Sequence, residues 1–299
     1  MRPNALRVTF DLSALHGPNL DALRQSPILR MCGRGQLAVA LTPIFLDELI
    51  AGYGAKGQLV PWRSNLEFAL EVCNDGIFLD KREIWRDELL CGRGPFARHK
   101  FPLSPTRRLI SFGNVLRQLR EMLESGDLQE YWASSQATRD ENRARQRRAR
   151  DISVQLRDQV SQRLRQVRLS GVLAHSPYHE FRDSVLVRTG RELMDLVDVR
   201  RSDVLKDQWA QNPRRFPFYY SFVVGFTYAG YYAAARHNEP IDLNAQADYE
   251  QLCYLNWLDV VVSNDQTFFR SAFNELWRWR KKRLMTTQEF LEFMNLLAV

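Results

Sequence analysis

Strand-like apolar runs that alternate with helical patterns stand near both ends of the chain, and the long middle is mostly helical. Near the start, Leu6–Phe10 and Gln36–Leu41 are strand-like, and each is followed by a helical pattern. Near the end, the apolar run Asp259–Ser263 lies between two helical patterns, Asn244–Trp257 and Gln266–Arg283. Alternation of strands and helices implies a parallel sheet with right-handed crossovers. We therefore predict an α/β fold whose sheet is assembled from both ends of the chain.

This pattern divides the chain into three predicted parts. Residues 1–63 form a first α/β part, residues 64–236 a large helical insertion, and residues 237–299 a second α/β part with C-terminal helices. Apolar residues recur at helical spacing along much of the insertion. Its predicted helices are Asn65–Asn74, Arg82–Leu90, Arg107–Leu123, Asp140–Arg168, Tyr178–Val197 and Phe218–Ala235.

The segment Phe216–Ala235 has twenty residues and no charged side chain, which is about the length that spans a bilayer. Five tyrosines are spread along it, and Pro217 suits the first turn of a helix. We expect a buried helix in a soluble protein with no membrane partner. The four cysteines form no CxxC pair, and the N-terminus lacks an apolar signal segment. Both features favour a reduced, cytoplasmic protein.

The positive charge of the chain is concentrated in two segments. The formal net charge is +7, yet residues 139–168 carry ten Arg against four acids and residues 278–283 add five cations, so the rest is net negative. Such segments suit a nucleic acid, with tryptophans between the cations for base stacking. The alternative is that the arginines are merely solvated and the tryptophans are packed. The predicted nucleic-acid contacts are Arg143, Arg147, Arg150, Arg278 and Arg280.

Acidic residues gather where the sheet is expected to bind a ligand. Residues 239–269 contain six acids and neither Lys nor Arg. Asp11 and Asp265 each follow a strand-like run, and ligands bind at the carboxyl ends of parallel strands. Glu48 lies in a helical pattern without a cation at helical spacing. Crowded carboxylates raise one another's pKa values, and Mg²⁺ or Mn²⁺ would relieve that repulsion.

Each acid also has an ordinary structural interpretation. Asp265 suits the N-cap of a helix that begins at Gln266, and Asp11 suits a turn at the end of a strand. Asp47 and Glu48 could be surface acids beside an apolar stripe, and Asp259 could be a turn or supporting residue. No single acid decides between these interpretations.

Three segments resemble the motifs of PIN-like nucleases. Asn244–Asp265 is similar to their C-terminal motif, with a helix aspartate, an apolar strand, a hydroxyl residue and a second aspartate. Val8–Ser13 resembles their first strand, and Thr42–Gly52 resembles the helix that carries their glutamate. The resemblance implies a three-layer α/β/α fold with a short parallel sheet. It also implies Mg²⁺ or Mn²⁺ held by Asp11, Glu48, Asp248 and Asp265, with Ser13, Ser263 and Asp259 in support.

The predicted function that follows from this resemblance is a metal-dependent endoribonuclease. RNA is the expected substrate. The expected biological role is that of a bacterial toxin or defence effector, and the expected partners are a protein inhibitor or further copies of the chain in a homo-oligomer. Three alternatives stay open: an inactive PIN-like module that binds RNA or protein, a nuclease directed at DNA, and an unrelated α/β protein with structural acids. The histidines and the glycine pairs offer no rival catalytic motif.

Overall fold

The computed structural model describes residues 5–49, 59–74, 76–89, 109–110, 118, 121, 124–125, 144, 177–194, 208–235 and 245–297. The chain forms two compact units. The first consists of residues 1–81, 103–136 and 254–299, and the second of residues 82–102 and 137–253. The predicted helix Asp140–Arg168 and most of the predicted helix Arg107–Leu123 lie outside the described residues.

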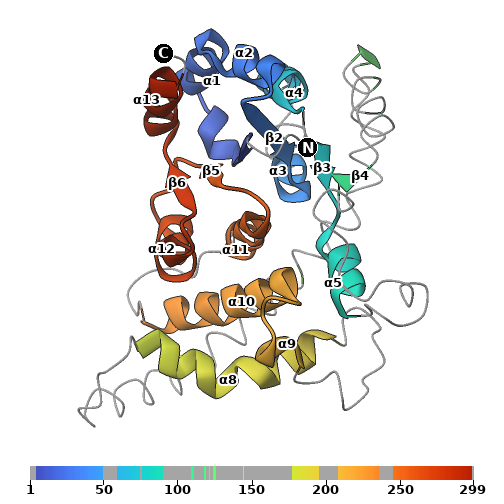
Figure 1. Ribbon diagram of the computed structural model, residues 1–299, viewed down its shortest axis with the longest axis vertical. Coiled ribbons are helices and arrows are strands. Elements are labelled where there is room, and N and C mark those ends of the chain that lie inside the picture. Colours follow the sequence, from blue (N-terminus) through green and yellow to red (C-terminus); the bar gives the residue numbers. More distant parts are fainter. Residues whose placement is uncertain are drawn as a thin grey trace. The chain divides into compact units, whose positions relative to one another are not determined.

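The first unit is built around a sheet of six described strands, in the order β4-β3-β2-β1-β5-β6 (Figure 1). Neighbouring strands pair in parallel, except for β3 and β4, which are antiparallel. β1 is central, because Val8 lies opposite Val39 of β2 on one side and Val260 of β5 on the other. The predicted α/β fold class, with a parallel sheet assembled from both ends of the chain, is confirmed. The strands are β1 (Leu6–Phe10), β2 (Leu37–Leu41), β3 (Gly76–Phe78), β4 (Leu109–Ile110), β5 (Val260–Val262) and β6 (Arg283–Met285).

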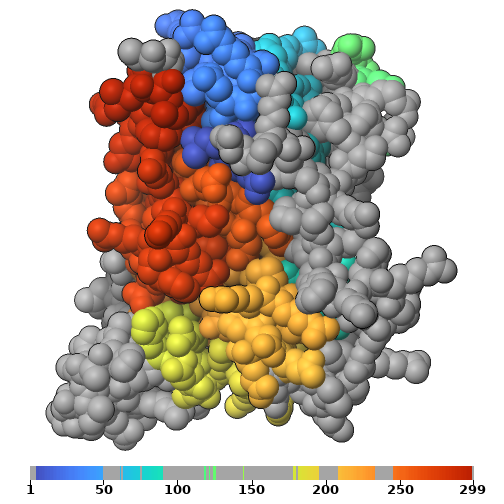
Figure 2. All heavy atoms as spheres, viewed as in Figure 1, coloured from blue at the N-terminus to red at the C-terminus, as the bar shows by residue number. Residues whose placement is uncertain are grey.

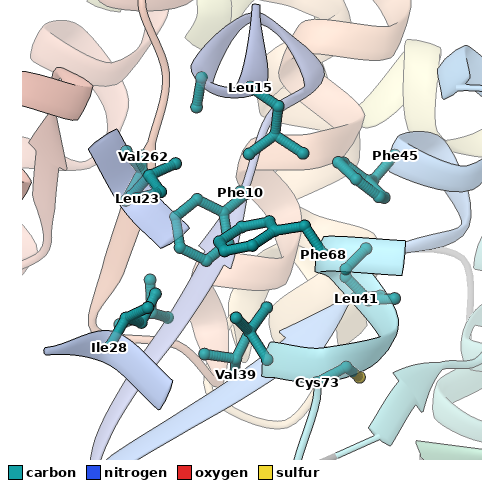
Figure 3. Close-up of a cluster of buried hydrophobic side chains, with 14 of the residues drawn as sticks. Phe10, Leu15, Leu23, Ile28, Val39, Leu41, Phe45, Phe68, Cys73 and Val262 are labelled. Atoms are coloured by element: carbon teal, nitrogen blue, oxygen red, sulfur yellow. The ribbon is translucent and has the colours of Figure 1, made fainter. Parts of the chain in front are cut away.

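One face of the sheet carries the hydrophobic core (Figure 3). Alternate strand residues point to this face, so Phe10, Val39 and Val262 meet there, fully or almost fully buried. The Phe10 ring makes edge contacts with Phe68 and Phe290, at centroid distances of 6.2 and 5.6 Å. Burial of one such side chain contributes about 1.5–3 kcal/mol. The helices that cover this face are α1 (Pro18–Gln25), α2 (Ile28–Arg34), α4 (Leu59–Val72) and α13 (Thr287–Leu297). The opposite face is covered as well, because Thr9, Ala40 and Val261 are fully buried, and this is compatible with three α/β/α layers.

The described part of the second unit is helical. The predicted helix in the charge-free segment is α10 (Pro217–Ala235), which packs against α8 (Pro177–Met194) and α11 (Ala245–Cys253). Tyrosine fits this interior where its hydroxyl has a partner. The Tyr219 hydroxyl of α10 donates a short hydrogen bond to the Gly190 carbonyl, and the Tyr178 hydroxyl of α8 donates to the Val224 carbonyl at 2.9 Å. Among the described helices, none is both long and apolar enough to cross a membrane. The unit also contains α5 (Lys81–Leu89) and α9 (Gln208–Gln211).

The structure differs from the predicted organisation in three places. The sheet unit continues past residue 63, because α4 and β3 belong to it, and the second unit begins near residue 82. The second unit also extends to residue 253 instead of 236, so α11 belongs to it. The predicted helix Gln266–Arg283 is also broken. α12 (Phe268–Leu276) is followed by the 3-10 helix η7 (Arg278–Arg280), and the chain then enters β6. Strands of three residues, such as β3 and β6, are too short to show an alternating pattern.

Candidate carboxylate site

The candidate site lies where the chain changes its direction of travel across the sheet. From β1 the chain moves to β2 and β3 on one side, and its C-terminal part adds β5 and β6 on the other. The carboxyl ends of β1 and β5 therefore flank a topological switch point, where open α/β sheets bind ligands. Asp11 follows β1 directly, and Asp265 stands three residues after the end of β5.

Three hydrogen bonds hold the buried side chain of Asp11. Its Oδ2 atom accepts from the Ser263 hydroxyl at 2.9 Å and from the Ser13 backbone N–H at 3.2 Å, and it also accepts a short bond from the Ser13 hydroxyl. All the hydrogen bonds that the described residues make to this carboxylate use Oδ2. The other oxygen is thus available to a ligand. The contacts also give Ser13 and Ser263 a defined role, which is to orient Asp11.

Asn264 and Thr287 make hydrogen bonds that hold the loop after Asp11, and neither residue was predicted from the sequence to belong to the site. The Asn264 N–H donates to the Ser13 hydroxyl at 2.9 Å, and its side-chain Nδ2 donates to the Ser13 carbonyl at 3.2 Å. Asn264 also exchanges hydrogen bonds of 3.0 Å with Thr287, whose hydroxyl donates to the Ala14 carbonyl at 2.9 Å. The loop after β1 is therefore tied to the loop after β5. Asn264 stands beside a predicted acid, but no spacing in the sequence points to Thr287.

Asp265 has one occupied oxygen. Its Oδ1 accepts from the backbone N–H and the hydroxyl of Thr267, at 2.6 and 2.7 Å. These bonds form a turn before α12, but Asp265 is not the N-cap of a helix that begins at Gln266, because α12 begins at Phe268 and its N-cap position is Thr267. The Asp265 N–H donates to the Ser263 hydroxyl at 3.1 Å. Ser263 therefore contacts both aspartates and keeps them at the same edge of the sheet.

Glu48 is the acid whose ionisation the site changes most clearly. It lies in α3 (Pro43–Leu49), which begins as predicted with the Thr42 hydroxyl accepting from the Phe45 N–H at 3.2 Å. Burial raises the pKa of Glu48 to about 8, and the negative charges of Asp11, Asp47 and Asp265 raise it further in the same direction. Because Asp11 and Asp265 both act on Glu48, the three predicted carboxylates share one electrostatic environment.

This pKa shift predicts a pH-dependent stability. Between pH 4.5 and 8 the folded protein holds a proton on Glu48 that the unfolded chain releases, so the free energy of unfolding falls as pH rises. Glu48→Gln cannot ionise and should escape this loss. The full shift corresponds to about 5 kcal/mol. Since Glu48 is partly exposed, we expect the variant to gain about 1–3 kcal/mol over the wild type at pH 8.5 and nothing at pH 4.5.

Urea unfolding curves at the two pH values measure this difference. Asp47→Asn is a suitable control, because Asp47 is exposed and contributes only part of the repulsion. A Glu48→Gln difference that is the same at both pH values would contradict the assignment.

The fourth predicted carboxylate, Asp248, is buried on α11 in the second unit. Its place in a four-carboxylate site therefore stays a prediction. Within the described residues, no group of three or more His, Cys, Asp or Glu side chains is arranged to hold a metal ion. The donor chemistry of Asp11, Glu48 and Asp265 nevertheless suits a hard cation, because only oxygen atoms are offered and their charges repel one another. A shared ion would require these carboxylates to draw together.

Asp259 and the two described arginines lie elsewhere in the first unit. Asp259 is at the amino end of β5, where it accepts from the Arg7 N–H at 3.0 Å and lies 3.8 Å from the Lys282 ammonium. These contacts give it a role in joining strands, at the opposite edge from Asp11. Arg278 is exposed, whereas Arg280 is partly buried. Arg143, Arg147 and Arg150 lie outside the described residues.

Comparisons with protein-family models, curated proteins and solved structures find no match to this chain. The similarity to PIN-like nucleases therefore stays a prediction that rests on the short motifs quoted above. The geometry of the carboxylate edge has to be interpreted from its own residues.

Proposed function

We propose that the protein is a metal-dependent nuclease of the PIN-like type that hydrolyses RNA phosphodiesters. Asp11, Glu48, Asp248 and Asp265 are its proposed metal ligands. The observation that supports this most directly is that the Ser263 hydroxyl donates to Asp11 and accepts from the Asp265 N–H, so both aspartates stand at the carboxyl edge of the sheet. Their charges add to burial in raising the pKa of Glu48. Burial and neighbouring negative charges disfavour an ionised carboxylate, and a bound cation would offset both effects. Acids in such surroundings are therefore candidates for a functional site.

The residues of the chain have distinct tasks in this proposal. A bound Mg²⁺ or Mn²⁺ would supply an activated water and neutralise charge on the scissile phosphate. Asp11 presents its unoccupied oxygen in a fixed direction, because Ser13, Ser263 and the backbone hold the other oxygen. Glu48 must lose its proton to bind, so cation binding below pH 8 should release protons. The same resemblance suggests a role as a bacterial toxin or defence effector.

A cleavage assay tests the proposal. The full chain is incubated with end-labelled RNA and DNA strands of the same sequence, with Mg²⁺, Mn²⁺ or EDTA. We expect RNA cleavage with either metal and none with EDTA. Binding of RNA without cleavage would support the inactive module instead, and cleavage confined to DNA would support the DNA-directed nuclease. Absence of both cleavage and RNA binding would favour an unrelated α/β protein.

A further inference from the structure

The segment 277–283, between α12 and β6, displays a large aromatic side chain among cations. Trp279 is 70% exposed, whereas Trp277 beside it is almost fully buried, at 3% exposed. The C-terminal segment that carries these residues is drawn red in Figure 2. An exposed apolar side chain by itself is ordinary at a protein surface. What distinguishes Trp279 is that cationic residues stand on both sides of it in the sequence, at Arg278, Arg280 and Lys281.

The indole of Trp279 is held in place by Arg280. The guanidinium carbon of Arg280 lies 4.7 Å from the ring centroid of Trp279 and 4.8 Å from that of Trp277. The same guanidinium donates to the Asn256 side chain at 3.4 Å. Arg280 thus joins the exposed ring to the buried ring through cation–π contacts. The predicted nucleic-acid contact of Arg280 stays a prediction beside this positioning role.

The backbone of the segment is also fixed. Lys281 has a φ of 59°, the only positive φ of a non-glycine residue in the described part of the chain. Lys282 donates to the Leu258 carbonyl at 2.6 Å and pairs with Asp259, which offsets its charge. The same short segment carries three exposed cations, and they are Arg278, Lys281 and Arg283. The guanidinium of Arg283 also lies over the Phe293 ring, at 5.1 Å from its centroid.

We propose that Trp279 and these three cations form a binding site for an unpaired nucleotide of a single-stranded nucleic acid. A base would stack on the indole, which accepts any base because every base has an aromatic face. The neighbouring phosphates would contact Arg278, Lys281 and Arg283. Charge complementarity favours this occupant, since an apolar protein partner would have no use for three exposed cations in the same short segment. A duplex fits poorly, because its bases are already stacked.

This site is separate from the carboxylate edge. Lys282 contacts Leu258, and Arg283 pairs with Val260 at the amino end of β5, whereas Asp11 and Asp265 follow the carboxyl ends of the strands. The sheet thus separates the two by the length of β1, on the order of 15 Å for its five residues. The proposed stacking site does not depend on metal chemistry, and it can be tested with cleavage suppressed.

The test is a binding titration of the full chain in EDTA with a fluorescent twelve-nucleotide RNA, either single-stranded or annealed to its complement. Stacking on one aromatic ring contributes about 1–3 kcal/mol, so Trp279→Ala should weaken single-strand binding roughly 5- to 150-fold. Trp279→Phe keeps a ring and should recover most of the affinity. Two matched controls remove an exposed cation on α2 (Arg30→Ala) or an exposed apolar side chain on α13 (Leu296→Ala), and both should change the affinity less than twofold.

Several results would overturn the proposal. One is unchanged single-strand affinity in Trp279→Ala, and another is an equal loss for single strand and duplex. A third is binding to anionic lipid vesicles that requires Trp279 while RNA binding does not, which would assign the segment to a membrane surface. Thermal unfolding of each variant checks the fold, and the exposure of Trp279 predicts little change. These outcomes can be interpreted even if the protein is not a nuclease, because the experiment measures binding and not cleavage.

Discussion

Asp11→Asn is expected to reduce metal-dependent RNA cleavage by about 10²–10³-fold or more, while the protein keeps its fold. Asparagine has the shape of aspartate and retains one acceptor oxygen. The Ser13 backbone N–H can only donate, so it selects the amide oxygen for the position that Oδ2 occupies. The amide NH₂ then replaces the oxygen that faces the proposed cation. The substitution thus removes the ligand and keeps the three hydrogen bonds.

Comparison of three variants makes this test specific. Asp11→Ala removes the ligand and also the acceptor for Ser13 and Ser263, so we expect equal loss of activity together with a loss of about 1–3 kcal/mol of stability. Asp21→Asn changes an exposed acid on α1 and should retain full activity. Rates are measured as kcat/KM with Mn²⁺, alongside thermal unfolding. Full activity in Asp11→Asn at wild-type stability would remove Asp11 from the site and with it the proposed chemistry.

The sheet and the two aspartates of its edge could be predicted because their signals are local. Leu6–Phe10 and Val260–Val262 are apolar runs of strand-forming residues, and the acids that follow them mark the carboxyl ends. The start of α3 was predictable for the same reason, because Thr42 and Pro43 are capping residues next to the helix they begin. Interactions between neighbours in the sequence need no knowledge of the fold.

The rest of the site depends on contacts between residues far apart in the sequence. The Thr287 hydroxyl donates to the Ala14 carbonyl across 273 positions, and no periodicity reports such a pair. The role of Arg280 is a second example. An arginine between two tryptophans looks the same in the sequence whether it contacts a nucleic acid or packs over the rings, as it does here. The boundary of the sheet unit was misplaced since β3 has only three residues and follows α4, whose pattern is helical. Burial, rather than composition, distinguishes these alternatives.

The N-terminus of α10, in the second unit, also depends on a residue far away in the sequence. Its substitution has the largest expected effect on stability. A helix leaves its first N–H groups without intrahelical partners. Pro217 has no N–H, and Tyr220 donates to Phe216, which leaves Phe218 and Tyr219. Phe216 has no side-chain acceptor. Instead, the fully buried Glu88 of α5 accepts from both N–H groups, at 3.1 Å from Phe218 and 2.8 Å from Tyr219.

Glu88→Ala should therefore destabilise the second unit by about 3 kcal/mol, because two buried N–H groups at the start of a helix lose the carboxyl group that accepts from them. Glu88→Gln keeps one acceptor oxygen and should lose roughly half as much. Glu83→Ala, an exposed acid on the same helix, should cost less than about 1 kcal/mol. Urea unfolding measures the loss, and hydrogen exchange at the start of α10 locates it. If Glu88→Ala matched Glu83→Ala in both measurements, the buried carboxylate would not be the cap of α10.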